Sequence, residues 1–238
     1  MPNNIDLNDY GSSNVENNEM SSWCLFCAHC EVDSFLTWRS HVSQIKSLTT
    51  NAIRNIARTI SVLPLNSRIL LTNALVVPHY NYGDVIYDGC GAGARDALER
   101  NQGYAAKSIL GRSKYSSSTG ALKELGWIPL SERRRIHQGV FVHKAIHLKN
   151  SLHATSAIHK LLPRHTHSTR HSQTNHLNSQ QHQSSLTETS TIYRSTHAWN
   201  SFPKDICSIA STKGFKDKIQ KYLIDNYDYD DSHVGGKK

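Results

Sequence analysis

The sequence predicts a mostly α-helical protein: an irregular helical assembly with a long disordered loop rich in His, Ser and Gln, and with disordered termini. Three observations support this fold class. Apolar residues recur at steps of three and four over much of residues 40–149 and again near residue 220, which places them on one face of a helix. Proline or glycine stands at the ends of several of these stretches. The remaining segments hold too few apolar residues to offset the entropy of ordering.

Changes in composition set the predicted domain boundaries. We expect a disordered N-terminus with a cysteine-rich stretch at 1–31 and a helical region at 32–162. A flexible linker is predicted at 163–190, a C-terminal helical segment at 191–226 and a polar tail at 227–238.

The first predicted helix begins near Ser40 and ends at Leu63, because Pro64 has no N–H to continue the hydrogen-bond ladder. Its expected buried face comprises Val42, Ile45, Leu48, Ala52, Ile53, Ile56, Ile60 and Leu63. A second helix is predicted over 67–77, before Pro78. The aromatic stretch 80–88 fits either a helix or irregular structure.

A third helix is predicted over 92–110, where Gly111 can adopt the left-handed conformation that ends a helix. A short helix over 119–125 should precede one that begins at 129–131, with Ser131 as its N-cap, and runs to about residue 149. Residues 154–162 would add one or two turns. The last amphipathic helix is defined by Phe215, Ile219, Tyr222 and Leu223, with Ser211 or Thr212 as its cap.

The charge balance is basic. The chain has 27 Lys and Arg against 19 Asp and Glu, a formal net charge of +8. Such a balance favours polyanionic partners, because each cation placed near a phosphate releases a condensed counterion; simple solubility is the alternative. The start of the chain lacks the pattern of a secretory signal, and the densest apolar run, 69–77, is too short for a membrane span. We therefore expect an intracellular protein of the nucleus or cytoplasm, not secreted, with free thiols and no membrane partner.

Three sequence blocks are more specific than this general pattern. They are Val77-Pro78-His79-Tyr80-Asn81-Tyr82-Gly83 with the preceding 63–75, Glu124-Leu125-Gly126-Trp127-Ile128-Pro129-Leu130, and Trp199-Asn200-Ser201-Phe202-Pro203 with Phe215 and Leu223. A fourth, Leu36-Thr37-Trp38 with His41, lies upstream. In order and spacing these blocks resemble the region that follows the palm in jockey-type non-LTR retrotransposon reverse transcriptases. The resemblance covers about 32–226 and implies that 32–162 is thumb-like.

The sequence departs from the family pattern in two ways. Asn101 and Gly103 stand inside the third helix, where an amide on the apolar face and a helical glycine suggest relaxed packing. The paired aspartates that hold two metal ions in the family's palm are absent upstream of Leu36. Tyr229-Asp230-Asp231 is interpreted as part of an acidic tail, since no predicted scaffold fixes it.

The predicted function is therefore that of a truncated, non-catalytic C-terminal fragment of an RNA-directed DNA polymerase. We expect no enzyme activity, no cofactor and no small-molecule substrate, and at most non-specific binding to RNA, DNA or an RNA–DNA hybrid. The resemblance implies that basic residues of the thumb-like region grip the nucleic-acid backbone. The candidates are Lys107, Arg112 and Lys114 at the end of the third helix, and Arg133 and Arg134 at the start of a later one.

Two other patterns leave alternatives open. Cys24, Cys27 and Cys30 could supply three ligands to zinc, but no fourth ligand is well placed. A real site would favour a co-opted helical interaction or nucleic-acid-binding protein with a small N-terminal zinc module. Five histidines between 165 and 182 fit a polar loop better than a weak metal site. Trp127, Trp199 and Tyr82 are expected in the core rather than as stacking platforms.

Overall fold

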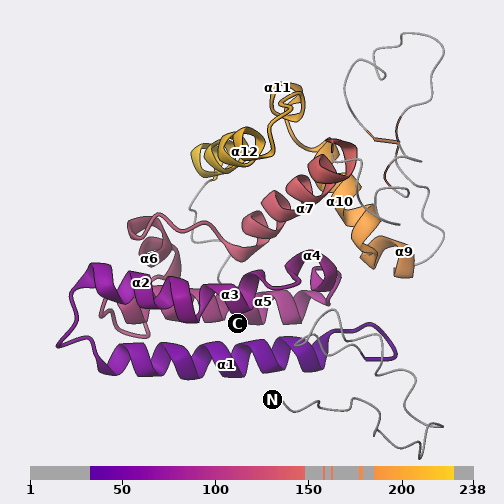
Figure 1. The fold of residues 1–238 in the computed structure, drawn as a ribbon. Coiled ribbons are helices and arrows are strands. Elements are labelled where there is room, and N and C mark those ends of the chain that lie inside the picture. The colour runs from indigo at the N-terminus through magenta and orange to yellow at the C-terminus, as the bar shows by residue number, and fades with distance from the viewer. Residues whose placement is uncertain (1–32, 148–157, 159–161, 163–176, 179–184, 228–238) are drawn as a thin grey trace, which may run out of the picture. The chain divides into compact units, whose positions relative to one another are not determined.

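The computed structural model describes residues 33–147, 158, 162, 177–178 and 185–227. This part of the chain is helical and contains no strand, which confirms the predicted fold class there (Figure 1). The predictions for 1–31, for most of 148–184 and for 228–238 lie outside the described residues. The helices are α1 (Arg39–Arg58), α2 (Leu65–Leu75), α3 (Val77–Asn81), α4 (Asp84–Tyr87), α5 (Ala92–Ile109), α6 (Ser118–Glu124), α7 (Leu130–His147), α9 (Ser185–Thr189), α10 (Thr191–Asn200), α11 (Lys204–Cys207) and α12 (Thr212–Asn226).

Helices α1 and α5 lie side by side and run in the same direction (Figure 1). Thr49 of α1 contacts Asn101 of α5, and Gly111, ten residues after Asn101, lies against the side chain of Ile60, eleven residues after Thr49. Both helices therefore end on the same side. The first hydrophobic core lies along this pair and is closed by α3 and α6; it includes Trp38, Val42, Ile45, Ile53, Ile56, Tyr80, Tyr87, Leu98, Ala105, Ile109, Leu122 and Trp127.

Helix α7 links this core to a second one. Its first residue, Leu130, belongs to the first core, whereas Ile136 and Val142 belong to the second. Helices α10 and α12 pack on α7 and complete the second core. Its other members include Ala145, Ile158, Leu177, Trp199, Phe202, Ile206, Phe215, Ile219 and Leu223.

The prediction that α1 continues to Leu63 is wrong. The hydroxyl of Thr59 donates to the carbonyl of Ile56, and the N–H of Ile60 bonds to Ala57 instead of to Ile56. The helical ladder therefore ends at Arg58 and a turn carries the chain to Pro64, which directly precedes α2. The predicted start of α2 at residue 67 is two residues late. Pro64 directly precedes the helix, and proline is favoured where a helix begins.

The predictions for residues 80–88 and for the expected core aromatics can be compared with the structure. The stretch 80–88 contains the end of α3 and all of α4, which Gly83 separates with a φ of 67°. Trp127 and Trp199 are buried as expected. Tyr82 and Leu48 are wrong as core residues, because their side chains are 45% and 42% exposed.

The caps of the later helices differ in origin. Ser211 caps α12 as predicted, through its hydroxyl and the N–H of Gly214. Ser131 does not cap α7. Instead the carboxylate of Glu99, on α5, accepts the N–H groups of Leu130 at 3.1 Å and Ser131 at 2.7 Å. A side chain of another helix thus caps α7, where the sequence predicted a cap by a local serine.

The segment predicted as a linker up to residue 190 contains ordered contacts. Residues 185–189 form α9, so the predicted linker ends too late. Leu177 is buried in the second core, and the side-chain amide of Asn200 bonds to both its N–H and its carbonyl at 2.9 Å. Within the described residues no helix has the length and apolar content to cross a bilayer.

Relaxed packing around Asn101 and Gly103 is also not observed. Asn101 is buried but hydrogen-bonded, as described below. A Cβ on Gly103 would lie 2.8 Å from the side chain of Ser118, so the glycine allows α6 to approach α5 closely.

Candidate nucleic-acid interface

The five basic residues predicted from the sequence do not form one site. Lys107, Arg112 and Lys114 lie together where α5 ends, beside the end of α1. Arg133 and Arg134 lie in the first turns of α7, against α5 and the segment that follows α4. The first group lies at the surface, whereas Arg133 is half-buried and Arg134 is buried.

Arg134 is excluded from a phosphate-binding role by its surroundings. Its side chain is 3% exposed, and its Nε lies 2.9 Å from a carboxylate oxygen of Asp88. Glu99 lies 3.6 Å away on the other side. Arg133 is also largely covered, and desolvation lowers its pKa, an effect that Asp84 and Glu99 oppose. The prediction that Arg134 contacts nucleic acid is therefore wrong, because a buried and paired guanidinium stabilises the fold.

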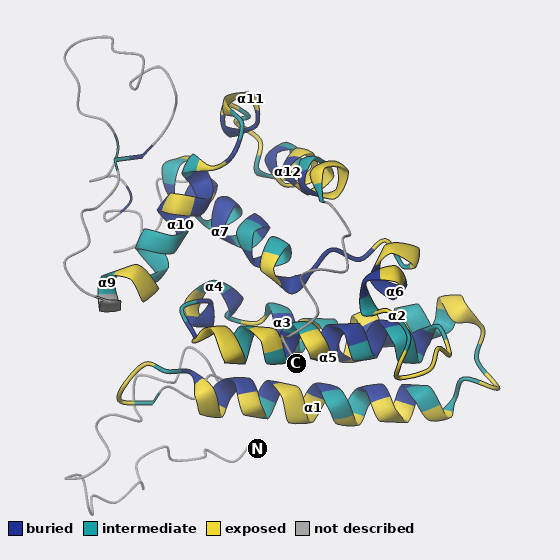
Figure 2. Ribbon diagram, turned by 180° about the vertical axis from the view of Figure 1, so that it is seen from behind, coloured by how far each residue is buried: buried dark blue, intermediate teal, exposed yellow. Residues whose placement is uncertain are grey.

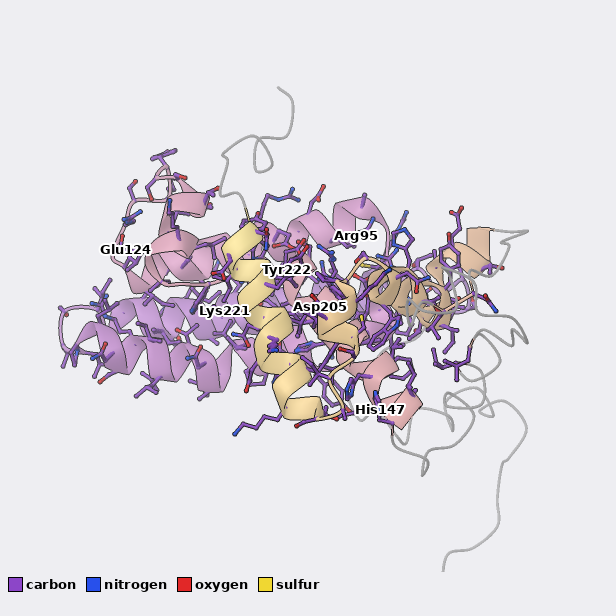
Figure 3. All side chains as sticks on the ribbon, turned by 90° about the horizontal axis from the view of Figure 1, so that it is seen from above. Arg95, Glu124, His147, Asp205, Lys221 and Tyr222 are labelled. Carbon is purple, nitrogen blue, oxygen red and sulfur yellow. The ribbon has the colours of Figure 1, made fainter. Side chains whose placement is uncertain are left out.

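The group at the end of α5 remains accessible. Arg112 forms an ion pair with Glu124 of α6, and both side chains are more than a third exposed. The ammonium of Lys107 donates to the carbonyl of Lys114 at 2.8 Å, which fixes the loop. Lys114 extends over the ring of Tyr115, 4.8 Å from its centroid. Figure 3 places Glu124 at the α6 end of the protein, away from Arg95 and His147.

Helix α1 carries a basic face that the sequence analysis missed. Four exposed cations, which we call the α1 stripe, are Arg39, Lys46, Arg54 and Arg58. At 100° per residue they fall within about 120° of the helix circumference, opposite the buried residues, and they span roughly 28 Å of its length. Figure 2 shows the buried residues of α1 on the side toward α5. Within the described chain, none of the four has an ion-pair partner.

The sequence around the α1 stripe contains no acidic residue. Residues 34–83 contain five Lys and Arg, the four of the stripe and Arg68, and no Asp or Glu. A polyanion following α1 would therefore meet no repelling carboxylate from this part of the chain. This gap in acidic residues was visible in the sequence, and it is the signal that could have identified the surface.

A cleft in the described part of the chain offers a different environment. It encloses about 880 Å³ between α5, α6, α7 and α10. Its lining contains five arginines and four acidic residues, so its charge is nearly balanced. Two of the arginines, Arg134 and Arg194, pair with Asp88, which leaves little free positive charge. The cleft is thus less suited to a polyanion than the α1 stripe.

Metal binding has no support in the described part of the chain, where no three His, Cys, Asp or Glu residues are grouped to hold an ion. Cys24, Cys27 and Cys30 lie outside the described residues, as do the five histidines between 165 and 182.

No family model, curated protein or solved structure matches this chain. Its surface chemistry and the sequence blocks named above are therefore what point to a function.

Proposed function

We propose that this chain binds nucleic acid through the sugar–phosphate backbone, as a helical, thumb-like region of the kind that follows the palm in non-LTR retrotransposon reverse transcriptases. The observation that carries the proposal is the α1 stripe, a run of cations on an acid-free segment that form no ion pair with any described residue. Cations spaced along one helix face can neutralise successive phosphates without reading bases. The partner is RNA, DNA or an RNA–DNA hybrid, and no catalytic role is proposed.

Lys107, Arg112 and Lys114 lie close to the end of α1, on the side of α5. Gly111 contacts Ile60, two residues beyond Arg58, so the loop after α5 continues where the α1 stripe ends. A backbone that follows α1 toward its C-terminus would reach these cations next. The alternative with an N-terminal zinc module depends on residues outside the described part of the chain, and no observation favours it.

Salt-dependent binding tests the proposal. The variant combines Lys46→Gln, Arg54→Gln and Arg58→Gln, and binding of a labelled RNA–DNA hybrid is followed by fluorescence anisotropy across salt concentrations. Loss of three phosphate contacts should make the slope of log affinity against log salt less negative by roughly 2 to 3. The affinity should fall equally for unrelated sequences, because backbone contacts carry no sequence information.

The matched control removes the same charge from α12. Lys216→Gln, Lys218→Gln and Lys221→Gln change three exposed lysines (Figure 3 labels Lys221) and should leave the slope nearly unchanged. Equal effects of the two triple variants would show that binding depends on net charge alone, and would contradict the assignment to α1. Absence of binding by the folded wild-type chain at low salt would contradict the proposed function itself.

A further inference from the structure

The loop between α5 and α6 presents an aromatic ring to solvent. Tyr115 is 85% exposed, the largest exposed fraction among the large apolar side chains that the structure describes. Its sequence neighbours are Lys114 and Ser116, and it belongs to neither hydrophobic core. Packing therefore does not account for this ring.

The loop that carries Tyr115 is held by several hydrogen bonds. Lys107 donates to the carbonyl of Lys114, and the N–H and hydroxyl of Ser116 donate to the carbonyl of Ser113 at 3.0 and 2.6 Å. The N–H of Tyr115 donates to the hydroxyl of Ser113 at 3.3 Å. The ring therefore projects from a defined turn. Little order would have to be gained when a flat ligand stacks on it.

Basic residues lie near the ring. Lys114 lies over it, and Arg112 and Lys107 are within the same loop and helix end. Among the described residues, Glu124 is the acid that bonds to this group, and Arg112 pairs with it. An exposed aromatic ring among cations matches the chemistry of an unpaired nucleotide, which offers a flat base and a phosphate.

We propose that Tyr115 is a stacking platform for a base of single-stranded nucleic acid, whose adjoining phosphates are held by Lys114 and the end of the α1 stripe. This inference rests on the proposed function and makes it more specific. Bases in a duplex are already stacked on one another, so the ring should add affinity for single strands and little for duplexes.

The test compares a labelled oligothymidylate with a labelled duplex of the same length by fluorescence anisotropy. Tyr115→Ala should weaken binding of the single strand roughly 5- to 100-fold, and change duplex binding less than about twofold. Tyr115→Phe keeps the ring and should bind like the wild type. The control Phe35→Ala removes a ring that is 82% exposed but precedes the opposite end of α1, and it should have no effect.

Each other outcome has a defined meaning. Wild-type binding of both probes with no loss in Tyr115→Ala would overturn the stacking role and leave the proposed function standing. Equal weakening of both probes would also overturn it, since the ring would then support backbone contact only. Binding of neither probe would overturn both proposals. If polyglutamate displaced the single strand and its own binding depended on Tyr115, the surface would be one for acidic proteins and the inference would be wrong.

Discussion

At the scale of single residues, Asn101 is the clearest case of a polar group satisfied by tertiary structure. Its side-chain oxygen lies 2.7 Å from the hydroxyl of Thr49 and 2.5 Å from that of Tyr80, and its NH2 group donates to Thr50 at 2.8 Å. Burial raises the pKa of Tyr80, so the phenol keeps its proton and donates it to the amide oxygen. The network joins α1, α3 and α5 inside the first core.

Removal of this amide should be costly. Asn101→Ala would leave the Tyr80 hydroxyl and its neighbours without their partner, and we expect the free energy of unfolding to fall by about 2–3 kcal/mol. Urea denaturation followed by tryptophan fluorescence measures the change. Asn55→Ala, at an exposed position of α1, serves as the control and should stay within about 0.5 kcal/mol. An Asn101→Ala protein as stable as the wild type would show that the network does not stabilise the fold.

His143 is a second buried polar residue, and its burial favours the neutral ring. Its Nε2 donates to the carbonyl of Ile209 at 2.7 Å, so in the neutral form Nδ1 accepts from the hydroxyl of Thr212 at 3.3 Å. The ring stacks on Phe215 with centroids 4.7 Å apart. Desolvation lowers the pKa of His143 below its usual value. Folding therefore favours the neutral ring.

The sign of the effect follows from that lowered pKa. Above the unfolded-state pKa of about 6.5 the contribution of His143 to stability is fully present. It is lost as the pH falls from there toward the folded-state value, because the unfolded chain binds the proton more readily. Urea midpoints at neutral and mildly acidic pH should differ less in His143→Gln than in the wild type or in His197→Gln, which changes an exposed histidine of α10. An equal pH dependence in all three proteins would contradict this role.

At the scale of elements, the existence of helices was predictable and their ends were not. The apolar repeat identified α1, α5, α7 and α12, because burial of one face depends on residues within the helix. The ends of helices depend on side chains elsewhere in the chain that cap them. Glu99 caps α7 from α5, and no local pattern around residue 130 indicates it.

Close packing of elements at Gly139 leads to another prediction. A Cβ there would lie 2.8 Å from Phe202, 3.3 Å from Ile219 and 3.4 Å from Phe215, so α7 and its neighbours meet at a glycine. Gly139→Ala should lower the free energy of unfolding by about 1–3 kcal/mol through overpacking. This loss would exceed the gain in helix propensity of about 1 kcal/mol.

The control for this substitution is Gly93→Ala in α5, where an added Cβ would meet nothing within 4 Å. It should raise the free energy of unfolding by up to about 1 kcal/mol. Thermal unfolding of both variants by circular dichroism provides the comparison. If Gly139→Ala were stabilised as much as Gly93→Ala, the close contact at α7 would not be real.

At the scale of the whole molecule, Asp88 connects the two cores. It follows α4 beside the first core and binds Arg134 and Gln138 of α7, and its Oδ2 lies 2.5 Å from a guanidinium nitrogen of Arg194 on α10. These helices belong to the second core. A buried charge that serves two cores should couple their unfolding.

Asp88→Asn tests this coupling. It keeps the shape but leaves Arg134 without its nearest carboxylate, and we expect a loss of about 3 kcal/mol. Calorimetry should show one transition in the wild type and two in the variant. The control Asp217→Asn changes an exposed carboxylate of α12 and should leave the transition in place. A single transition at unchanged temperature in Asp88→Asn would contradict the coupling.

The candidate interface was only partly predictable at this scale. The proximity of Lys107, Arg112 and Lys114 was predictable, because they lie in the last turn of α5 and in the loop that follows it. Arg134 was misjudged, since its burial depends on Asp88, 46 positions earlier in the numbering. Tyr115 could not be distinguished from a core aromatic by sequence, because exposure is decided by the packing of the surrounding loop.

The bonds between Asn200 and the backbone of Leu177 hold this residue in the second core independently of the chain before it. The N–H and the carbonyl of Leu177 both bond to Asn200 of α10, so its place in the second core does not depend on the number of residues before it. Cleavage of the chain at a position before Leu177 should therefore leave this residue bound to α10.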